Sequence, residues 1–140
     1  MNRIQFFNIP SSDLEPSKLK HWVERLALHY GVNIDNFVVN VIGKEKMLEM
    51  NQNHLNHDTH TDILTFDYGN QRVINAELFV SEYMCTLNAA ENAQSTENEY
   101  LRLISHGFLH TLGYSDKKPN EKRLMTAHED RCLQMFHVKQ

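Results

Sequence analysis

The sequence has little cysteine and no excess of positive charge. Its 140 residues include two cysteines, Cys85 and Cys132, which lie far apart and form no C-x-x-C pair. Both are expected to be buried thiols, which indicates a reducing compartment. The 14 Lys and Arg stand against 18 Asp and Glu, a formal net charge of −4. This balance excludes a cationic protein that coats nucleic acid.

Long apolar runs and low-complexity segments are also missing. No stretch approaches the 18 or so apolar residues of a membrane span, and the N-terminal apolar run is too short for a signal peptide. We therefore expect a cytoplasmic protein with no membrane partner. The three prolines and five glycines fall singly between periodic segments, which predicts one domain over residues 1–140.

Hydrophobic periodicity places most strands before most helices. Strands are predicted around residues 4–7, 37–42, 62–68 and 73–80, the last two adjacent and antiparallel across Gly69-Asn70. Helices are predicted over residues 17–30, after Gly43, and over 81–93, 96–112 and 120–136. This order predicts an α+β fold: a four-stranded mixed sheet packed with about five helices.

Histidine is what the sequence has in excess, with nine in 140 residues. One of the helices predicted in the C-terminal half of the chain begins at a cap at Thr96. On this helix His106 and His110 lie on one side, roughly opposite the apolar stripe. An i,i+4 histidine pair allows two imidazoles to reach one zinc ion. The pair alone is weak evidence for a metal site, because about 0.6 such pairs are expected by chance in this composition.

The residues after the pair favour a metal site. Gly113 lies three residues beyond His110 and Asp116 six, the spacing at which extended zinc motifs return a third ligand. The number of such complete patterns expected by chance in this composition is only about 0.002. Two histidines and one aspartate leave a tetrahedral position open for water, as in catalytic zinc sites. Gly107 follows His106, so the glutamate base of H-E-x-x-H proteases is missing.

These residues resemble the YbeY-like family of zinc-dependent endoribonucleases that act in ribosomal RNA maturation. The family signature H-G-x-L-H-L-x-G-Y-[DN]-H stands here as HGFLHTLGYSD over 106–116, and T-D-V-L-S-F as TDILTF over 61–66. The resemblance covers nearly the whole chain. It implies one zinc ion per chain at the ligand positions His106, His110 and Asp116, with other divalent metals left open. It also implies that the partner is RNA, namely ribosomal RNA or the RNA of ribosomal particles.

The chain departs from the family pattern at several positions. Asp116 replaces the usual third histidine, which keeps a ligand but adds a negative charge. Leu55 stands seven residues before Asp62, where the family commonly carries an arginine thought to contact substrate. Ala76 replaces the glycine of the family's G-D-I-x-I strand.

Substrate contacts follow less directly from the sequence. His57, Asp58 and His60 precede a predicted strand and either line the cleft opposite the metal helix or form a solvated loop. A basic run after Asp116 is a phosphate-binding rim or a solvated face: Lys117, Lys118, Lys122 and Arg123. His128 lies on the apolar stripe of its helix, where a buried, hydrogen-bonded histidine is expected rather than a ligand.

The general base is not assigned by the sequence. A metal-bound hydroxide needs no base, and Asp58 and His60 are the alternatives. Asp62 begins a predicted strand, where it either caps its own backbone or acts as a catalytic acid.

The sequence thus predicts a metal-dependent endoribonuclease acting on single-stranded RNA in ribosomal RNA maturation. In a second hypothesis the protein is an RNA- or ribosome-binding assembly factor, whose metal mainly orders the segment after Gly113. A protease-like hydrolase of another substrate is a third hypothesis, which Gly107 disfavours.

Overall fold

The computed structural model describes residues 3–55 and 61–138, apart from the side chains of residues 54 and 55. Its elements follow one another along the chain as strands and helices and then as helices alone. They are β1 (Arg3–Phe7), α1 (Pro16–Tyr30), β2 (Asn33–Ile42), α2 (Lys44–Leu55), β3 (Ile63–Asp67), β4 (Val73–Ser81), α3 (Glu82–Glu91), α4 (Thr96–Thr111) and α5 (Pro119–His137). None of these described helices has the length and apolar character needed to cross a membrane.

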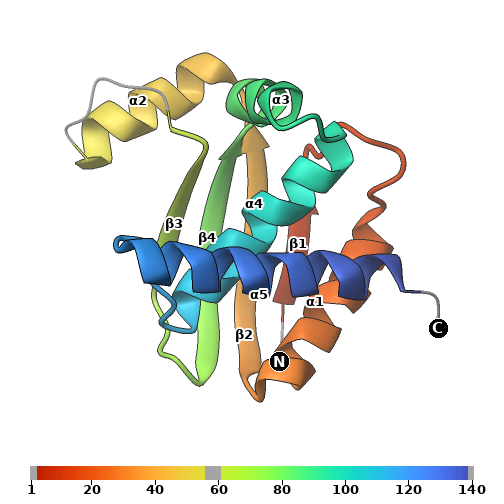
Figure 1. The fold of residues 1–140 in the computed structure, drawn as a ribbon. Coiled ribbons are helices and arrows are strands. Elements are labelled where there is room, and N and C mark those ends of the chain that lie inside the picture. Colours follow the sequence, from red (N-terminus) through yellow and green to blue (C-terminus); the bar gives the residue numbers. More distant parts are fainter. Residues whose placement is uncertain (1–2, 56–60, 139–140) are drawn as a thin grey trace.

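The four strands form one mixed sheet in the order β1-β2-β4-β3. The β1–β2 and β2–β4 pairs are parallel, whereas β3 and β4 form an antiparallel hairpin. Helices α1 and α4 pack on the sheet, and α5 lies across α4 and contacts α1 (Figure 1). The predicted α+β fold, with a four-stranded mixed sheet and five helices, is confirmed.

Buried and less buried residues alternate along the central strands, and the buried ones face α4, so the core lies between the sheet and this helix. Phe37 of β2 and Leu78 of β4 are fully buried, and the Phe37 ring packs edge-on against Phe108 of α4 with ring centroids 5.8 Å apart. Burying a side chain of this size contributes roughly 1.5–3 kcal/mol. The same helix therefore carries both core residues and, on another side, the two histidines of the predicted metal site.

Element ends differ from the sequence prediction by a few residues. The cap of α4 is Ser95, whose hydroxyl accepts a hydrogen bond from the backbone N–H of Asn98 at 3.1 Å, rather than Thr96. Strand β2 begins at Asn33, four residues before the predicted start, because it pairs with β4 from Val73 onward. Both cysteines are buried and free, as predicted.

Candidate metal centre

Three predicted metal residues lie together at the end of α4. The Nε2 atoms of His106 and His110 are 2.9 Å apart. The Asp116 carboxylate oxygen Oδ2 is 3.1 Å from Nε2 of His106 and 3.7 Å from Nε2 of His110. All three side chains are partly exposed, so the cluster can be reached from solvent.

The chain reverses at Gly113 to return Asp116 to the helix. Gly113 has a φ of +101°, which is in the region that favours glycine. Its N–H donates to the His110 carbonyl at 3.0 Å, and the N–H of Tyr114 donates to the Leu109 carbonyl at 3.2 Å. A Cβ at Gly113 would also lie 2.6 Å from Nε2 of Gln71 in the β3–β4 connection. The Gln71 amide is the far end of an exposed, flexible side chain that can move aside, so it is the positive φ that requires glycine at this position.

The second nitrogen of each histidine faces a hydrogen-bond acceptor. His106 Nδ1 lies 2.6 Å from the carboxylate of Glu129, and His110 Nδ1 lies 2.9 Å from the backbone carbonyl of Tyr114. Because a carbonyl only accepts, His110 donates from Nδ1, and acceptance by a carboxylate oxygen of Glu129 requires the same of His106. In the neutral imidazoles both Nε2 atoms then present lone pairs to each other and to Asp116. Three converging acceptors repel one another unless a cation, either a proton or a metal ion, lies between them.

The spacing of these atoms fits a single metal ion. Ligand atoms about 2.0–2.1 Å from a tetrahedral zinc ion lie about 3.3 Å from each other. The observed separations of 2.9, 3.1 and 3.7 Å bracket that value. The residues present therefore fit a divalent ion, with the second nitrogen of each histidine held as is usual for metal-bound imidazoles.

The electrostatics of His106 also favour positive charge at this point. Burial opposes a charged imidazole, but the hydrogen bond and charge of Glu129, together with the charge of Asp116, raise the pKa of His106 above its ordinary value. Glu129 is itself held by Arg102, whose guanidinium nitrogen lies 2.9 Å away.

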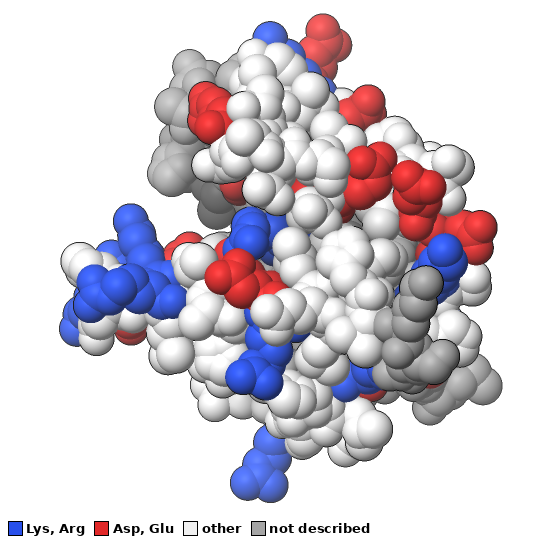
Figure 2. Space-filling view, turned by 45° about the vertical axis from the view of Figure 1, so that its right-hand side comes forward, with Lys and Arg blue, Asp and Glu red and all other residues white. Residues whose placement is uncertain are grey.

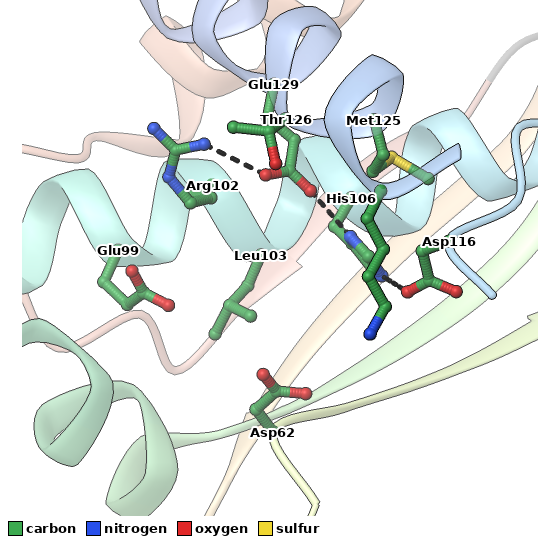
Figure 3. Close-up of a pocket in the computed structure, with 10 residues that line it drawn as sticks. Asp62, Glu99, Arg102, Leu103, His106, Asp116, Met125, Thr126 and Glu129 are labelled. Carbon is green, nitrogen blue, oxygen red and sulfur yellow. Dashed lines mark hydrogen bonds and ion pairs between the residues drawn. The ribbon is translucent and has the colours of Figure 1, made fainter. Parts of the chain in front are cut away.

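Two hollows adjoin the cluster and share Asp62, His106 and Asp116 in their linings. The first has a volume of about 290 Å³ and lies between α4, α5 and the start of β3. The second has a volume of about 490 Å³ and follows β3. Figure 3 shows Asp62 across the first hollow from His106 and Asp116. The Asp62 carboxylate accepts a hydrogen bond from the side-chain amide of Asn88 in α3 at 3.2 Å.

Comparison with known proteins identifies the family. A family profile described as Endoribonuclease YbeY matches residues 5–137. A relative of that name from Phocaeicola vulgatus is 34% identical over 126 residues, which cover 90% of this chain and 91% of the relative. Another, from Flavobacterium johnsoniae, is 42% identical over 96 residues, 69% of each chain. The chain belongs to the YbeY endoribonuclease family.

The YbeY resemblance predicted from the two motifs is thereby confirmed. The solution structure of TM1509 from Thermotoga maritima is similar in fold, with a TM-score of 0.65 and 22% sequence identity. That likeness covers 96% of this chain and 89% of the TM1509 chain.

The other predicted site residues lie less close to one another than the three residues of the cluster do. Basic side chains gather where α5 begins, at the left of Figure 2. Lys122 lines the first hollow, whereas Lys117, Lys118 and Arg123 are exposed and stand outside the described linings of both hollows. The predicted residues His57, Asp58 and His60, and the side chain of Leu55, lie outside the described part of the chain.

His128 is half-buried rather than fully buried, and its Nδ1 lies 2.7 Å from the Tyr30 hydroxyl. Its expected hydrogen bond is therefore present.

Sequence reasoning missed two residues that support this YbeY-type centre. Glu129 lies between Met125 and Cys132 on the buried stripe of α5, and a carboxylate on an apolar stripe is itself a signal. Arg102 precedes His106 by one helical turn and lies on the same side of α4. The contact between Glu129 and Arg102 depends on how α5 packs across α4. Spacing along the sequence does not show this packing.

Proposed function

We propose that this protein is a zinc-dependent endoribonuclease that cleaves single-stranded RNA during ribosomal RNA maturation. The observation that carries the proposal is the convergence of three acceptor atoms, from His106, His110 and Asp116, beside two open hollows. Membership of a family whose members are named endoribonucleases supports RNA as the substrate.

Zinc is the proposed ion because two imidazoles and a carboxylate, with a fourth position open, are the donors of catalytic zinc sites. When bound, the ion supplies Lewis acidity, lowering the pKa of a water molecule and offsetting the negative charge of a phosphodiester. His106, His110 and Asp116 hold it. Glu129 and the Tyr114 carbonyl keep the two imidazoles turned toward it.

The RNA strand is proposed to cross the cluster, with nucleotides on either side of the scissile phosphate in the two hollows. Lys122 lines the first hollow and offers an ammonium group to the RNA backbone. Lys117, Lys118 and Arg123 lie nearby in the sequence and extend this basic surface. Local positive charge at the start of α5 thus offsets the mildly acidic balance of the whole chain.

We assign the general base to Asp62. Its carboxylate lines both hollows and lies across the first hollow from His106 and Asp116 (Figure 3). The hydrogen bond from Asn88 orients this carboxylate. An ionised carboxylate in this place accepts the proton of an attacking water molecule. Asp62 thereby takes the role that a glutamate at position 107 has in H-E-x-x-H proteases.

The test compares metal content with cleavage of a single-stranded RNA oligonucleotide. The wild-type protein is expected to contain about one zinc ion and to cleave, whereas His110→Ala loses both. Asp62→Asn is expected to keep zinc and to lose about 10²-fold or more in kcat. His21→Ala is the matched control, because His21 is 73% exposed on α1, and it should change neither property.

Two outcomes contradict parts of the proposal. Full zinc content in His110→Ala refutes the ligand assignment, and unchanged kcat in Asp62→Asn refutes the assigned base. A zinc-loaded protein that binds ribosomal particles but cleaves no RNA supports the assembly-factor hypothesis instead.

A further inference from the structure

Glu129 lies between the metal cluster and Arg102, an arginine that is partly exposed. This carboxylate is 7% exposed, on the face of α5 that packs against α4. One of its oxygens lies 2.6 Å from Nδ1 of His106, and the other accepts a hydrogen bond from Arg102 at 2.9 Å. A second guanidinium nitrogen of Arg102 donates to Asp130 at 2.7 Å. Figure 3 shows this line of contacts from Arg102 through Glu129 and His106 to Asp116.

We propose that Glu129 is a positioning residue of the metal centre and that Arg102 holds it in place. The inference rests on the proposed ligand role of His106. By accepting the Nδ1 proton, Glu129 fixes the imidazole tautomer in which Nε2 is free to bind a metal. The same bond fixes the plane of the ring, and a carboxylate partner strengthens the imidazole as a donor.

Arg102 explains how a carboxylate can be kept at this buried place. An ionised carboxylate is costly to bury unless it is paired and hydrogen-bonded. Glu129 has one partner for each oxygen, so it is paired with the charge of Arg102 and hydrogen-bonded to His106. Both of these oxygens are engaged, which leaves Glu129 unsuited to act as the base. Arg102 is likewise bonded to two carboxylates, so it supports the centre rather than holding a phosphate.

The two histidines differ in how they are held. His110 donates to a backbone carbonyl, that of Tyr114, whereas His106 donates to a side chain from a different helix. The second contact joins α5 to the centre across 23 positions of sequence. Metal affinity is therefore expected to depend on the docking of α5, through a residue that binds neither metal nor RNA.

The decisive experiment measures zinc affinity in the metal-free protein by competition with a chelator of known affinity. Glu129→Leu removes the acceptor and is expected to weaken zinc binding about 10–100-fold. Glu129→Gln keeps one acceptor oxygen and is expected to fall between Glu129→Leu and the wild type. Asp130→Asn is the matched control, because Asp130 contacts Arg102 but is exposed, and it should leave zinc affinity within about twofold.

A second readout separates positioning from general stability. Nitrogen-15 NMR of the imidazoles should place the His106 proton on Nδ1 in the wild-type protein and redistribute it in Glu129→Leu. The wild-type spectrum alone tests the proposal if Glu129→Leu does not fold, because a neutral His106 imidazole that carries its single proton on Nε2 rather than Nδ1 overturns it. Unchanged zinc affinity in a folded Glu129→Leu, or an equal loss in Asp130→Asn, also overturns it.

The variant His106→Ala keeps the two hypotheses distinguishable. If His106→Ala retains full zinc affinity, the ligand assignment itself fails. If His106→Ala loses zinc while Glu129→Leu retains it, the ligand assignment stands and only the positioning role of Glu129 is refuted.

Discussion

Replacement of Gly107 by alanine tests how closely α4 must approach the sheet to place its histidines. A Cβ at this position would lie 2.5 Å from Cδ2 and 2.9 Å from Cγ of Leu78, and 3.1 Å from Cδ1 of Ile63. Leu78 is fully buried, so it has no free space to enter. Glutamate at position 107, as in H-E-x-x-H proteases, would meet the same atoms. The fold therefore excludes that protease motif at this contact.

The expected effect follows from two opposed contributions. Alanine is favoured over glycine inside a helix by about 1 kcal/mol. Overpacking of a filled core costs about 1–3 kcal/mol, and here two of the new contacts would be shorter than 3.0 Å. Contacts this short place the cost in the upper half of that range, about 2–3 kcal/mol. We therefore expect Gly107→Ala to destabilise the protein by about 1–2 kcal/mol net, which lowers Tm by roughly 3–8 °C at this chain length. Because α4 must move outward, zinc affinity should fall as well.

Thermal and urea unfolding of Gly107→Ala, Leu78→Ala and the double variant provide the assay. Leu78→Ala alone should cost about 2–5 kcal/mol by leaving a cavity. In that background the new methyl group has space, so Gly107→Ala should be neutral or stabilising by up to about 1 kcal/mol. A single variant Gly107→Ala with unchanged or raised Tm would refute the reasoning, as would strict additivity in the double variant.

Two further predictions concern pH and metal removal. Burial raises the pKa of Glu99, against the opposing effects of Asn88 and Arg102, so this carboxyl costs stability as pH rises and it ionises. Glu99→Gln should therefore unfold at a higher temperature than the wild type at pH 8 but not at pH 4, and an equal difference at both would contradict this. Removal of zinc by a chelator should lower Tm, since ligand at 1,000 times its Kd stabilises by about 4 kcal/mol. Calorimetry before and after zinc is restored checks this, and a Tm indifferent to both steps would count against the metal site.

Local spacing was sufficient to predict which residues form the cluster. His106 and His110 share a helix, and Gly113 and Asp116 follow within six residues, so a turn of known geometry relates all four. The same argument predicted most helices and strands, because the spacing of apolar residues along a segment reports which side of an element is buried. Where the cap of α4 was misplaced, Ser95 and Thr96 are adjacent and both suit the position.

The pairing of strands and helices that are distant in sequence could not be predicted from the sequence, for a physical reason. The sheet order β1-β2-β4-β3 places β4, not β3, beside β2, and this choice depends on which strands the helices can cover together. Asp62 lies immediately before β3 and Glu129 lies on α5, and neither has a fixed spacing to His106. Their positions beside His106 depend on how the elements pack together.

Helix α5 connects these observations. Near its start Lys122 lines the first hollow, and two turns later Glu129 contacts His106. Near its end the carbonyl of Cys132 accepts a hydrogen bond from the buried indole N–H of Trp22 at 2.8 Å, which ties α5 to α1. Because Lys122 and Glu129 are carried by one helix, a shift of α5 must disturb the proposed RNA contact and the metal geometry together. The core contact at Trp22 thus belongs to the physical basis of the site, although Trp22 itself lies outside the lining described for either hollow.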